Sequence, residues 1–191
     1  MSQSFLPPAR YWEGKTTGFL NQSGVDMSEV AKQTHEESNR GHEHGKYLTF
    51  FLSQEEYGIQ ILQVRKIMGL TSIRSVPESP HYMRGVLNLR GEMIPVVELR
   101  ARFGMEPAED TEETCIVVVQ IGGQLMGLLV DRVSEVLAME DEDVVDAPDL
   151  GGAMDTGWIL GMGKHEDRIT LLLDMDAVFP AETVSELSTA A

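Results

Sequence analysis

The sequence predicts an all-β protein made of two similar units, each a small barrel of about five short strands. Short runs of apolar, often β-branched residues recur between turn-forming residues, and long helical runs are few. Residues 47–67 also resemble residues 116–136 at a constant offset of 69, with Gly58 matching Gly127. Apolar strands can resemble one another by chance, but the shared glycine and the shared order of elements favour a duplication. Closure into a barrel would hide the strand edges that a small unit otherwise exposes.

The composition and the repeat divide the chain into four segments. Residues 1–45 are rich in Ser, Gln, Glu, Asn, Gly and His and have no sustained apolar period, so we expect a flexible N-terminal tail. Two β-subdomains are expected at approximately residues 46–112 and 113–180. Residues 181–191 are expected to form a C-terminal tail.

The first subdomain opens with a strand over residues 47–52 and a turn over residues 53–56. Residues 57–67 then form a second strand that runs into a third strand or a bend. A hairpin follows, in which Gly91 supplies the freedom for φ > 0 that a tight turn needs. Arg90 is therefore expected at the bend of a stiff hairpin. The alternative is an ordinary hairpin whose arginine is merely solvated.

The second subdomain repeats this order. A strand over residues 116–121 opens it, and a later hairpin joins residues 158–162 to residues 169–175 through a longer turn. Asp174 and Asp176 fit the start of a short closing helix, because carboxylates interact favourably with the N-terminal end of a helix dipole. A D-x-D pair also occurs in metal sites, but near a chain end the helix start is the better interpretation.

Composition and charge narrow the classes of function. The chain carries 31 acidic and 15 basic residues, a formal net charge of −16, so we expect no nucleic acid as a partner. No apolar run approaches the roughly 18 residues of a membrane span, and the N-terminus does not resemble a secretory signal. Cys115 is the only cysteine, which excludes an internal disulfide and fits a reducing cytosol. We therefore expect a cytoplasmic protein with no direct membrane insertion.

The sequence shows no catalytic constellation, so we expect no enzyme, no cofactor and no bound metal. It contains no phosphate-binding loop, no nucleophile elbow and no zinc-protease helix. Cys115 follows Glu112 and Glu113, whose charges would raise its pKa, so a structural role is favoured over a nucleophilic one. Three histidines in the N-terminal tail would lose conformational entropy before they could hold a metal. A barrel that binds a small ligand stays an alternative, although no residue pattern specifies a ligand.

Five ordered motifs across residues 47–179 resemble the CheW family, adaptors that join bacterial chemoreceptors to the histidine kinase CheA. These motifs are YGIQILQVRKI (57–67), VPESP (76–80), GVLNLRG (85–91), IPVVELR (94–100) and GLLVDRVSEV (127–136). The resemblance implies two SH3-like five-stranded β-barrel subdomains with short helices and a C-terminal helix, and no catalysis. It also implies two partners, a CheA-type histidine kinase and the cytoplasmic tip of methyl-accepting chemoreceptors, which recruit the adaptor to membrane receptor arrays. A similar scaffold in a parallel chemosensory pathway, controlling surface motility or gene expression, is the alternative.

The resemblance also implies a set of receptor-binding residues. Arg90, in the Asn-Leu-Arg-Gly turn, would hold an acid or a carbonyl of the receptor helix in a fixed direction. Val64 would supply apolar contact, and Cys115 and Ile116 would line the facing strand of a groove. Lys66 stands where the family commonly has Glu, and this reversed charge should change the preferred partner.

Overall fold

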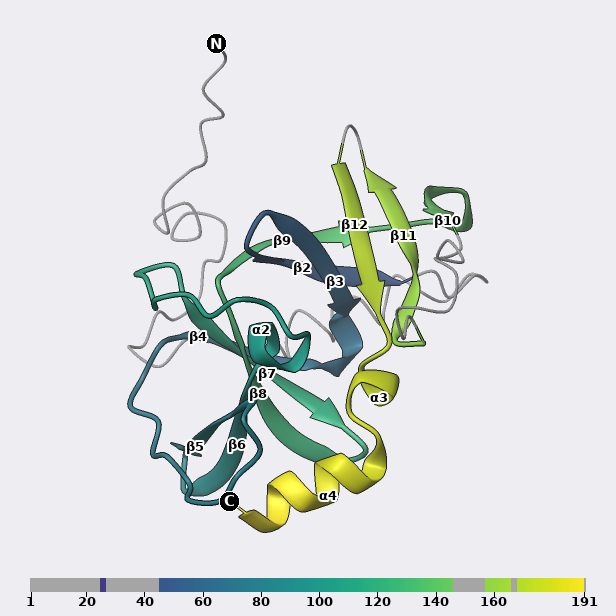
Figure 1. Cartoon of the computed structure of the whole chain (residues 1–191). Helices are drawn as coiled ribbons and strands as arrows, with labels where there is room; N and C mark the ends of the chain where they lie inside the picture. The colour runs from purple at the N-terminus through teal and green to yellow at the C-terminus, as the bar shows by residue number, and fades with distance from the viewer. Residues whose placement is uncertain (1–24, 27–44, 146–156, 166–167, 191) are drawn as a thin grey trace.

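The computed structural model describes residues 25–26, 45–145, 157–165 and 168–190, which form an all-β fold with a few short helices (Figure 1). The flexible tail expected over residues 1–45 lies outside the described residues, apart from residues 25–26 and 45. Among the described helices, none is long and apolar enough to cross a membrane.

Two sheets make up the fold, and each has five strands of six or seven residues and one strand of two residues. The first sheet contains, in spatial order, β1 (Val25–Asp26), β4 (Val64–Gly69), β7 (Cys115–Ile121), β8 (Gln124–Val130), β6 (Glu92–Glu98) and β5 (Met83–Leu89). The second contains β10 (Val144–Val145), β11 (Ile159–His165), β12 (Arg168–Leu173), β3 (Glu55–Gln60), β2 (Lys46–Leu52) and β9 (Arg132–Ala138). The all-β prediction with two five-stranded units is confirmed.

The two sheets exchange strands between the halves of the sequence. The β2–β3 hairpin of the first half pairs with β9 and β12 of the second, whereas the β7–β8 hairpin of the second half pairs with β4 and β6 of the first. A division near residue 112 therefore does not separate the two sheets. A sequence repeat identifies which strands correspond, but it does not identify their partners in a sheet.

The matched glycines occupy corresponding places in this exchanged arrangement. Gly58 pairs with Leu172 in the parallel ladder between β3 and β12, and Gly127 pairs with Val96 in the parallel ladder between β8 and β6. A Cβ atom on Gly58 would lie 3.0 Å from Leu172 Cδ2, and one on Gly127 would lie 3.0 Å from Ile116 Cγ2. Close packing therefore favours glycine at both positions, in agreement with a duplication.

Most of the buried apolar residues form one central core that draws on both sheets. Its fully buried members include Phe50 and Ile59 from the second sheet and Val117 and Met126 from the first. Each sheet also encloses a smaller core of its own. The first is made of Leu87, Ile94, Val96, Ile116, Val118 and Leu129, and the second of Tyr47, Leu137, Met139 and Leu172.

The helices are short and lie at the ends of strands. A 3-10 helix, η2 (Ile61–Gln63), makes the expected bend between β3 and β4, and another, η3 (Asp141–Asp143), precedes β10. The corresponding helices α2 (Leu99–Arg102) and α3 (Met175–Val178) follow β6 and β12. The Asp174 carboxylate accepts hydrogen bonds from the backbone N–H groups of Asp176 and Ala177, at 3.0 and 3.2 Å, which confirms the helix start.

The C-terminal helix that the resemblance implies is present, whereas the expectation of a C-terminal tail after residue 180 is wrong. Residues of this segment form α4 (Ala181–Ala190), which packs beside β6. Val184 and Leu187, one turn apart, are buried in the central core. This tertiary burial stabilises the helix. The segment has ten residues and only two large apolar ones, so its own sequence gives a weak helix signal.

The inner faces of the two sheets differ in polarity. Thr49, Glu56 and Thr170 are buried in the second sheet, whereas the repeat aligns Thr49 with Val118 and Glu56 with Leu125 in the first. The Glu56 side chain is 3% exposed, and its nearest ionic partner, Arg168 Nη1, lies 3.6 Å from Oε1. Thr170 Oγ1 lies 3.5 Å from Oε2, at the limit of a hydrogen bond, and Oε1 accepts none. Glu56 is thus a weakly compensated buried acid.

We expect Glu56→Leu, which copies the other repeat, to leave the free energy of unfolding unchanged or to raise it by up to about 2 kcal/mol. Urea denaturation at neutral pH measures this change. The reverse exchange, Leu125→Glu, is the matched control and should lower the free energy of unfolding by about 1–3 kcal/mol, because it places a carboxylate against an apolar core. A loss of more than about 1 kcal/mol in Glu56→Leu would show that the buried acid is stabilising.

Candidate partner-binding surface

Arg90 lies at the bend of the β5–β6 hairpin, as the sequence predicts. Its φ is 55° and that of Gly91 is 96°, so both central residues of the two-residue turn are left-handed, as in a type I′ turn. The Gly91 N–H donates a hydrogen bond of 2.8 Å to Asn88 Oδ1, which fixes the bend. Arg90 is exposed, and its side chain makes no hydrogen bond or ion pair among the described residues. The hairpin therefore presents a cation that has no partner in the described part of the chain.

The other four candidate residues lie on the neighbouring strands β4 and β7, where Met68 pairs with Ile116 and Gly69 with Cys115. All four are buried, with exposures of 0% for Val64, 6% for Lys66, 9% for Cys115 and 0% for Ile116. In the sheet order, β8 lies between these two strands and the β5–β6 hairpin. The structure thus brings these four residues together on two paired strands, whereas Arg90 lies on another hairpin of the same sheet.

The four buried residues divide between two faces of the first sheet. Val64 and Cys115 belong to the central core, and Ile116 belongs to the first sheet's own core. Lys66 pairs with Val118, a member of that same small core, so Lys66 lies on the face of Ile116. A register shift between Val64 and Lys66 separates the two faces along β4.

Three apolar residues that sequence reasoning did not select are more accessible along β4 and β9. Ile67, Val133 and Val136 are partly buried and pack against the central core. The repeat already aligns Ile67 with Val136, and that correspondence was the available signal. We call these three residues the edge patch.

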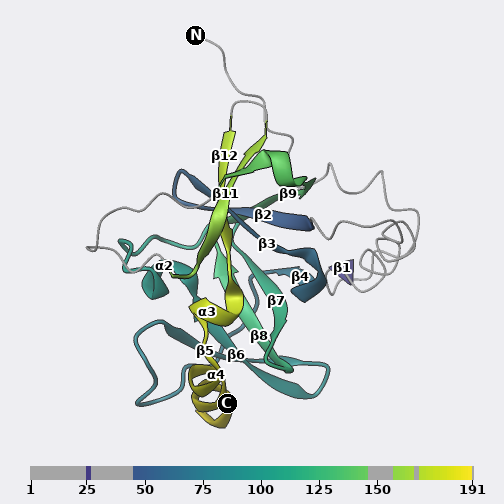
Figure 2. The same ribbon diagram turned by 90° about the vertical axis from the view of Figure 1, so that its right-hand side faces the viewer.

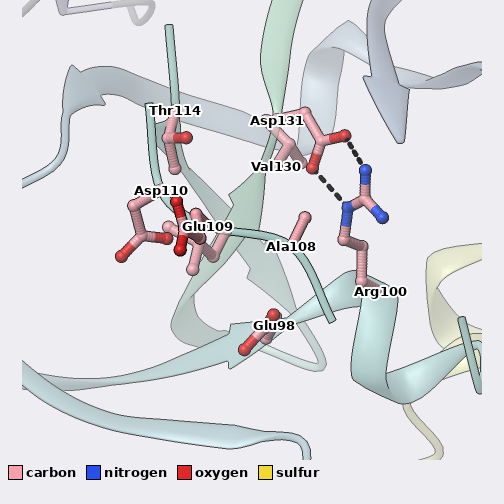
Figure 3. A pocket seen from close by; sticks show the side chains of 9 residues that line it. Glu98, Arg100, Ala108, Glu109, Asp110, Thr114, Val130 and Asp131 are labelled. Atoms are coloured by element: carbon pink, nitrogen blue, oxygen red, sulfur yellow. Dashed lines mark hydrogen bonds and ion pairs between the residues drawn. The ribbon is translucent and has the colours of Figure 1, made fainter. Parts of the chain in front are cut away.

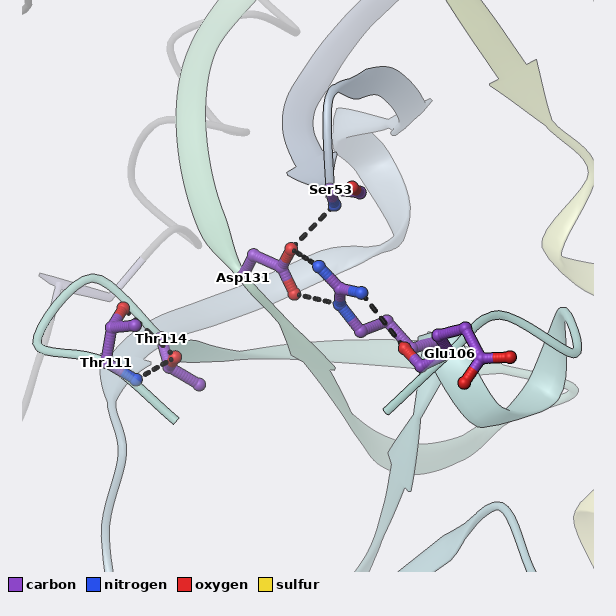
Figure 4. Close-up of polar contacts among 6 residues, drawn as sticks. Ser53, Glu106, Thr111, Thr114 and Asp131 are labelled. Carbon is purple, nitrogen blue, oxygen red and sulfur yellow. Dashed lines mark hydrogen bonds and ion pairs between the residues drawn. The ribbon is translucent and has the colours of Figure 1, made fainter. Parts of the chain in front are cut away.

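An ion pair links the two sheets on the side of α2 (Figure 4). Arg100 Nε and Nη2 donate to Asp131 Oδ1 and Oδ2 at 2.7 and 2.5 Å, and the backbone N–H of Ser53 donates to Oδ2 at 2.6 Å. Arg100 follows β6 of the first sheet, whereas Ser53 forms the β2–β3 turn of the second. Burial acts to raise the pKa of Asp131, but the hydrogen bonds from Arg100 and Ser53 outweigh it and hold this pKa below its usual range.

A shallow acidic hollow borders this ion pair (Figure 3). Its lining includes Glu98, Glu109, Asp110 and Asp131. Arg84 binds Glu98 at 3.2 Å and Asp110 at 2.6 Å, so cations of the chain itself already compensate three of these four acids. Among the described residues, no group of three metal-ligating side chains occurs.

Comparison with known proteins decides the family. A model described as "CheW-like domain" matches residues 46–183, most of the chain. The chain belongs to the CheW family.

Curated CheW proteins match the same region. The chain is 37% identical over 135 residues to the chemotaxis protein CheW of Rhizobium meliloti, covering 71% of this chain and 87% of that protein. It is 32% identical over 140 residues to CheW of Klebsiella aerogenes, covering 73% and 84% of the two chains. Among solved structures, the scaffolding protein TtCheW from Thermoanaerobacter tengcongensis superposes with a TM-score of 0.66 at 32% identity, covering 73% of this chain and 94% of that one. The two SH3-like subdomains implied by the resemblance agree with this CheW fold.

Within the CheW fold, Cys115 has the properties of a structural residue. Burial raises the pKa of its thiol to about 11, and the nearby Glu113 charge adds to this effect, against a hydrogen bond with the Val133 backbone that lowers it. The thiol therefore stays protonated near neutral pH and is a poor nucleophile.

We expect Asp131→Asn to lower the free energy of unfolding by about 1–3 kcal/mol, because it removes the carboxylate that joins Arg100 to Ser53. The loss should shrink as the pH falls. A native pKa below the usual value of about 3.9 means that the unfolded chain binds the proton more tightly, so the stabilisation is present above that pH and is lost as the pH falls through the native pKa.

Chemical denaturation of both proteins between pH 7 and about pH 3 measures this difference. Asp110→Asn is the control, because Asp110 is a similarly exposed partner of an arginine that keeps Glu98, and it should cost less than about 1 kcal/mol. An Asp131→Asn effect that is equal at both ends of the pH range would contradict the assigned role.

Proposed function

We propose that this CheW-family chain is a non-enzymatic adaptor that couples methyl-accepting chemoreceptors to a CheA-type histidine kinase and helps to build receptor–kinase arrays. The observation that carries this proposal is Arg90, an exposed cation on a fixed type I′ bend, which has no partner within the residues that the structure describes. A guanidinium held in this way loses little conformational entropy when it binds a carboxylate or carbonyl group.

The receptor partner in this proposal is an amphipathic helical hairpin. Its acidic or carbonyl groups would meet Arg90, and its apolar face would meet the edge patch, since an amphipathic helix binds through apolar anchors and a polar rim. The buried residues Val64, Cys115 and Ile116 would not touch the receptor. They would fix the shape of β4 and β7 through their packing. Lys66 is 6% exposed on the other face of β4, and from there its positive charge would favour an acidic or neutral receptor group.

The kinase partner and the absence of catalysis rest on family membership and on chemistry. Relatives carry the names chemotaxis protein and scaffolding protein. The protonated Cys115 thiol supports a binding role over a catalytic one. The proposed adaptor would act in the cytoplasm and reach the membrane only through its receptors.

Three substitutions at Arg90 separate binding from stability. Arg90→Glu should weaken binding to a receptor hairpin by about tenfold or more, and Arg90→Lys by less, because lysine keeps the charge but loses the bidentate fork. Arg90→Gly should also weaken binding, yet it should not lower the free energy of unfolding, because glycine adopts φ = 55° without steric cost.

Calorimetric binding to a purified receptor hairpin and receptor-dependent kinase activity provide the measurements. Lys164→Glu is the matched control, because Lys164 is an exposed cation in the corresponding hairpin of the second sheet, and it should bind as the unsubstituted protein does. Full receptor binding and full kinase control by Arg90→Glu would refute the role of Arg90.

A further inference from the structure

The outer edge of β4 pairs with an added two-residue strand, β1. β4 pairs on one side with β7, and on the other with β1, whose register sets Val25 against Ile67 and Asp26 against Lys66 (Figure 2). An edge strand presents unpaired backbone N–H and C=O groups, which a second extended segment can satisfy. The pairing is antiparallel and only two residues long, so it adds little area and can be displaced.

The CheW fold itself does not require a strand at this edge. In the repeat, β9 of the second sheet corresponds to β4, and it pairs on one side with β2. Within the described residues no strand pairs with the outer edge of β9. Among the described residues, one of the two corresponding edges is therefore paired and the other is not, and the difference comes from residues 25–26.

The residue types of the two paired segments are complementary. β4 carries two consecutive basic residues, Arg65 and Lys66, and the register sets the acidic Asp26 opposite Lys66. Lys66 is 6% exposed and takes part in none of the ion pairs among the described residues.

We propose that the outer edge of β4 is a strand-addition site that the chain's own residues 25–26 occupy, and that this occupancy competes with partner binding beside β4. The competition rests on the proposed function, because the displaced partner is the receptor hairpin. Ile67 belongs both to the paired register and to the edge patch, so a helix laid on that patch meets the N-terminal segment. The paired segment is tethered to the same chain, which raises its effective concentration at the edge.

The apparent affinity for the receptor equals the intrinsic affinity multiplied by the fraction of molecules whose edge is open. Releasing the N-terminal segment should therefore tighten receptor binding, and a marginal two-residue pairing predicts a gain of about two- to tenfold. The N-terminal segment would thus set a threshold that a receptor must exceed.

The test uses the full chain with Val25→Pro and Asp26→Pro together, since proline cannot donate to a strand ladder. Hydrogen exchange followed by mass spectrometry reports on peptides that span β4, with β7–β8 peptides as an internal reference. Ala31→Pro together with Lys32→Pro is the matched control, because it introduces the same two prolines outside the paired residues. We expect faster exchange in β4 for the first variant alone, with an unchanged melting temperature for both.

The same variants are then titrated with a purified receptor hairpin. Tighter binding by the Val25→Pro and Asp26→Pro protein, together with faster β4 exchange, supports the proposal. Unchanged exchange in β4 overturns it, and so does faster exchange with unchanged affinity. β4 protection that falls on dilution assigns the added strand to a second copy and overturns occupancy within one chain.

A charge-exchange pair gives an independent measurement. Asp26→Lys should speed exchange in β4, and adding Lys66→Asp should restore part of the protection by reversing both charges. If no variant binds the receptor hairpin, the proposed function fails, whereas exchange in β4 still decides whether residues 25–26 occupy the edge.

Discussion

The burial of one apolar core between two sheets that exchange strands is the constraint on which the rest of this structure depends. Phe50 and Val117 come from different sheets, and both are fully excluded from solvent in that core. Neither sheet can move away from the other without exposing it. The ion pair between Arg100 and Asp131 lies at the margin of the same junction and adds a directional restraint that apolar packing lacks. Surfaces built from both sheets therefore keep a fixed geometry.

Much of the fold could be predicted from the sequence because its signals are local. The apolar strands, the bend between β3 and β4, the Asp174 helix start and the hairpin at Arg90 each depend on residues within one short segment. The pairing of strands within a sheet, in contrast, depends on distant residues. The pairing of β3 with β12 joins residues more than a hundred positions apart, and nothing in either strand distinguishes that partner from a neighbour. The C-terminal helix follows from the resemblance, but the composition of residues 181–191 favoured a tail, since burial against distant residues stabilises α4.

The candidate site could be predicted only in part. Arg90 follows from turn chemistry, and its exposure agrees with that interpretation. Lys66 could not be placed from alternation alone, because a register shift in β4 puts it on the opposite face to Val64. The contact of Arg100 with Asp131 carries no sequence signature, since the two residues lie 31 positions apart in a chain with abundant acids. The edge patch was visible only as a set of matched positions in the repeat.

The exchange of hairpins between the two halves also bears on the origin of the chain. A half-length precursor with one copy of each strand could not complete either sheet alone, because each needs strands from both halves. Two such molecules could complete both sheets by swapping hairpins around a two-fold axis. Once two copies of the gene were joined, the two halves of the chain would no longer need identical sequences. Glu56 and Leu125, an acid and an apolar residue at matching positions, show that the two halves now differ.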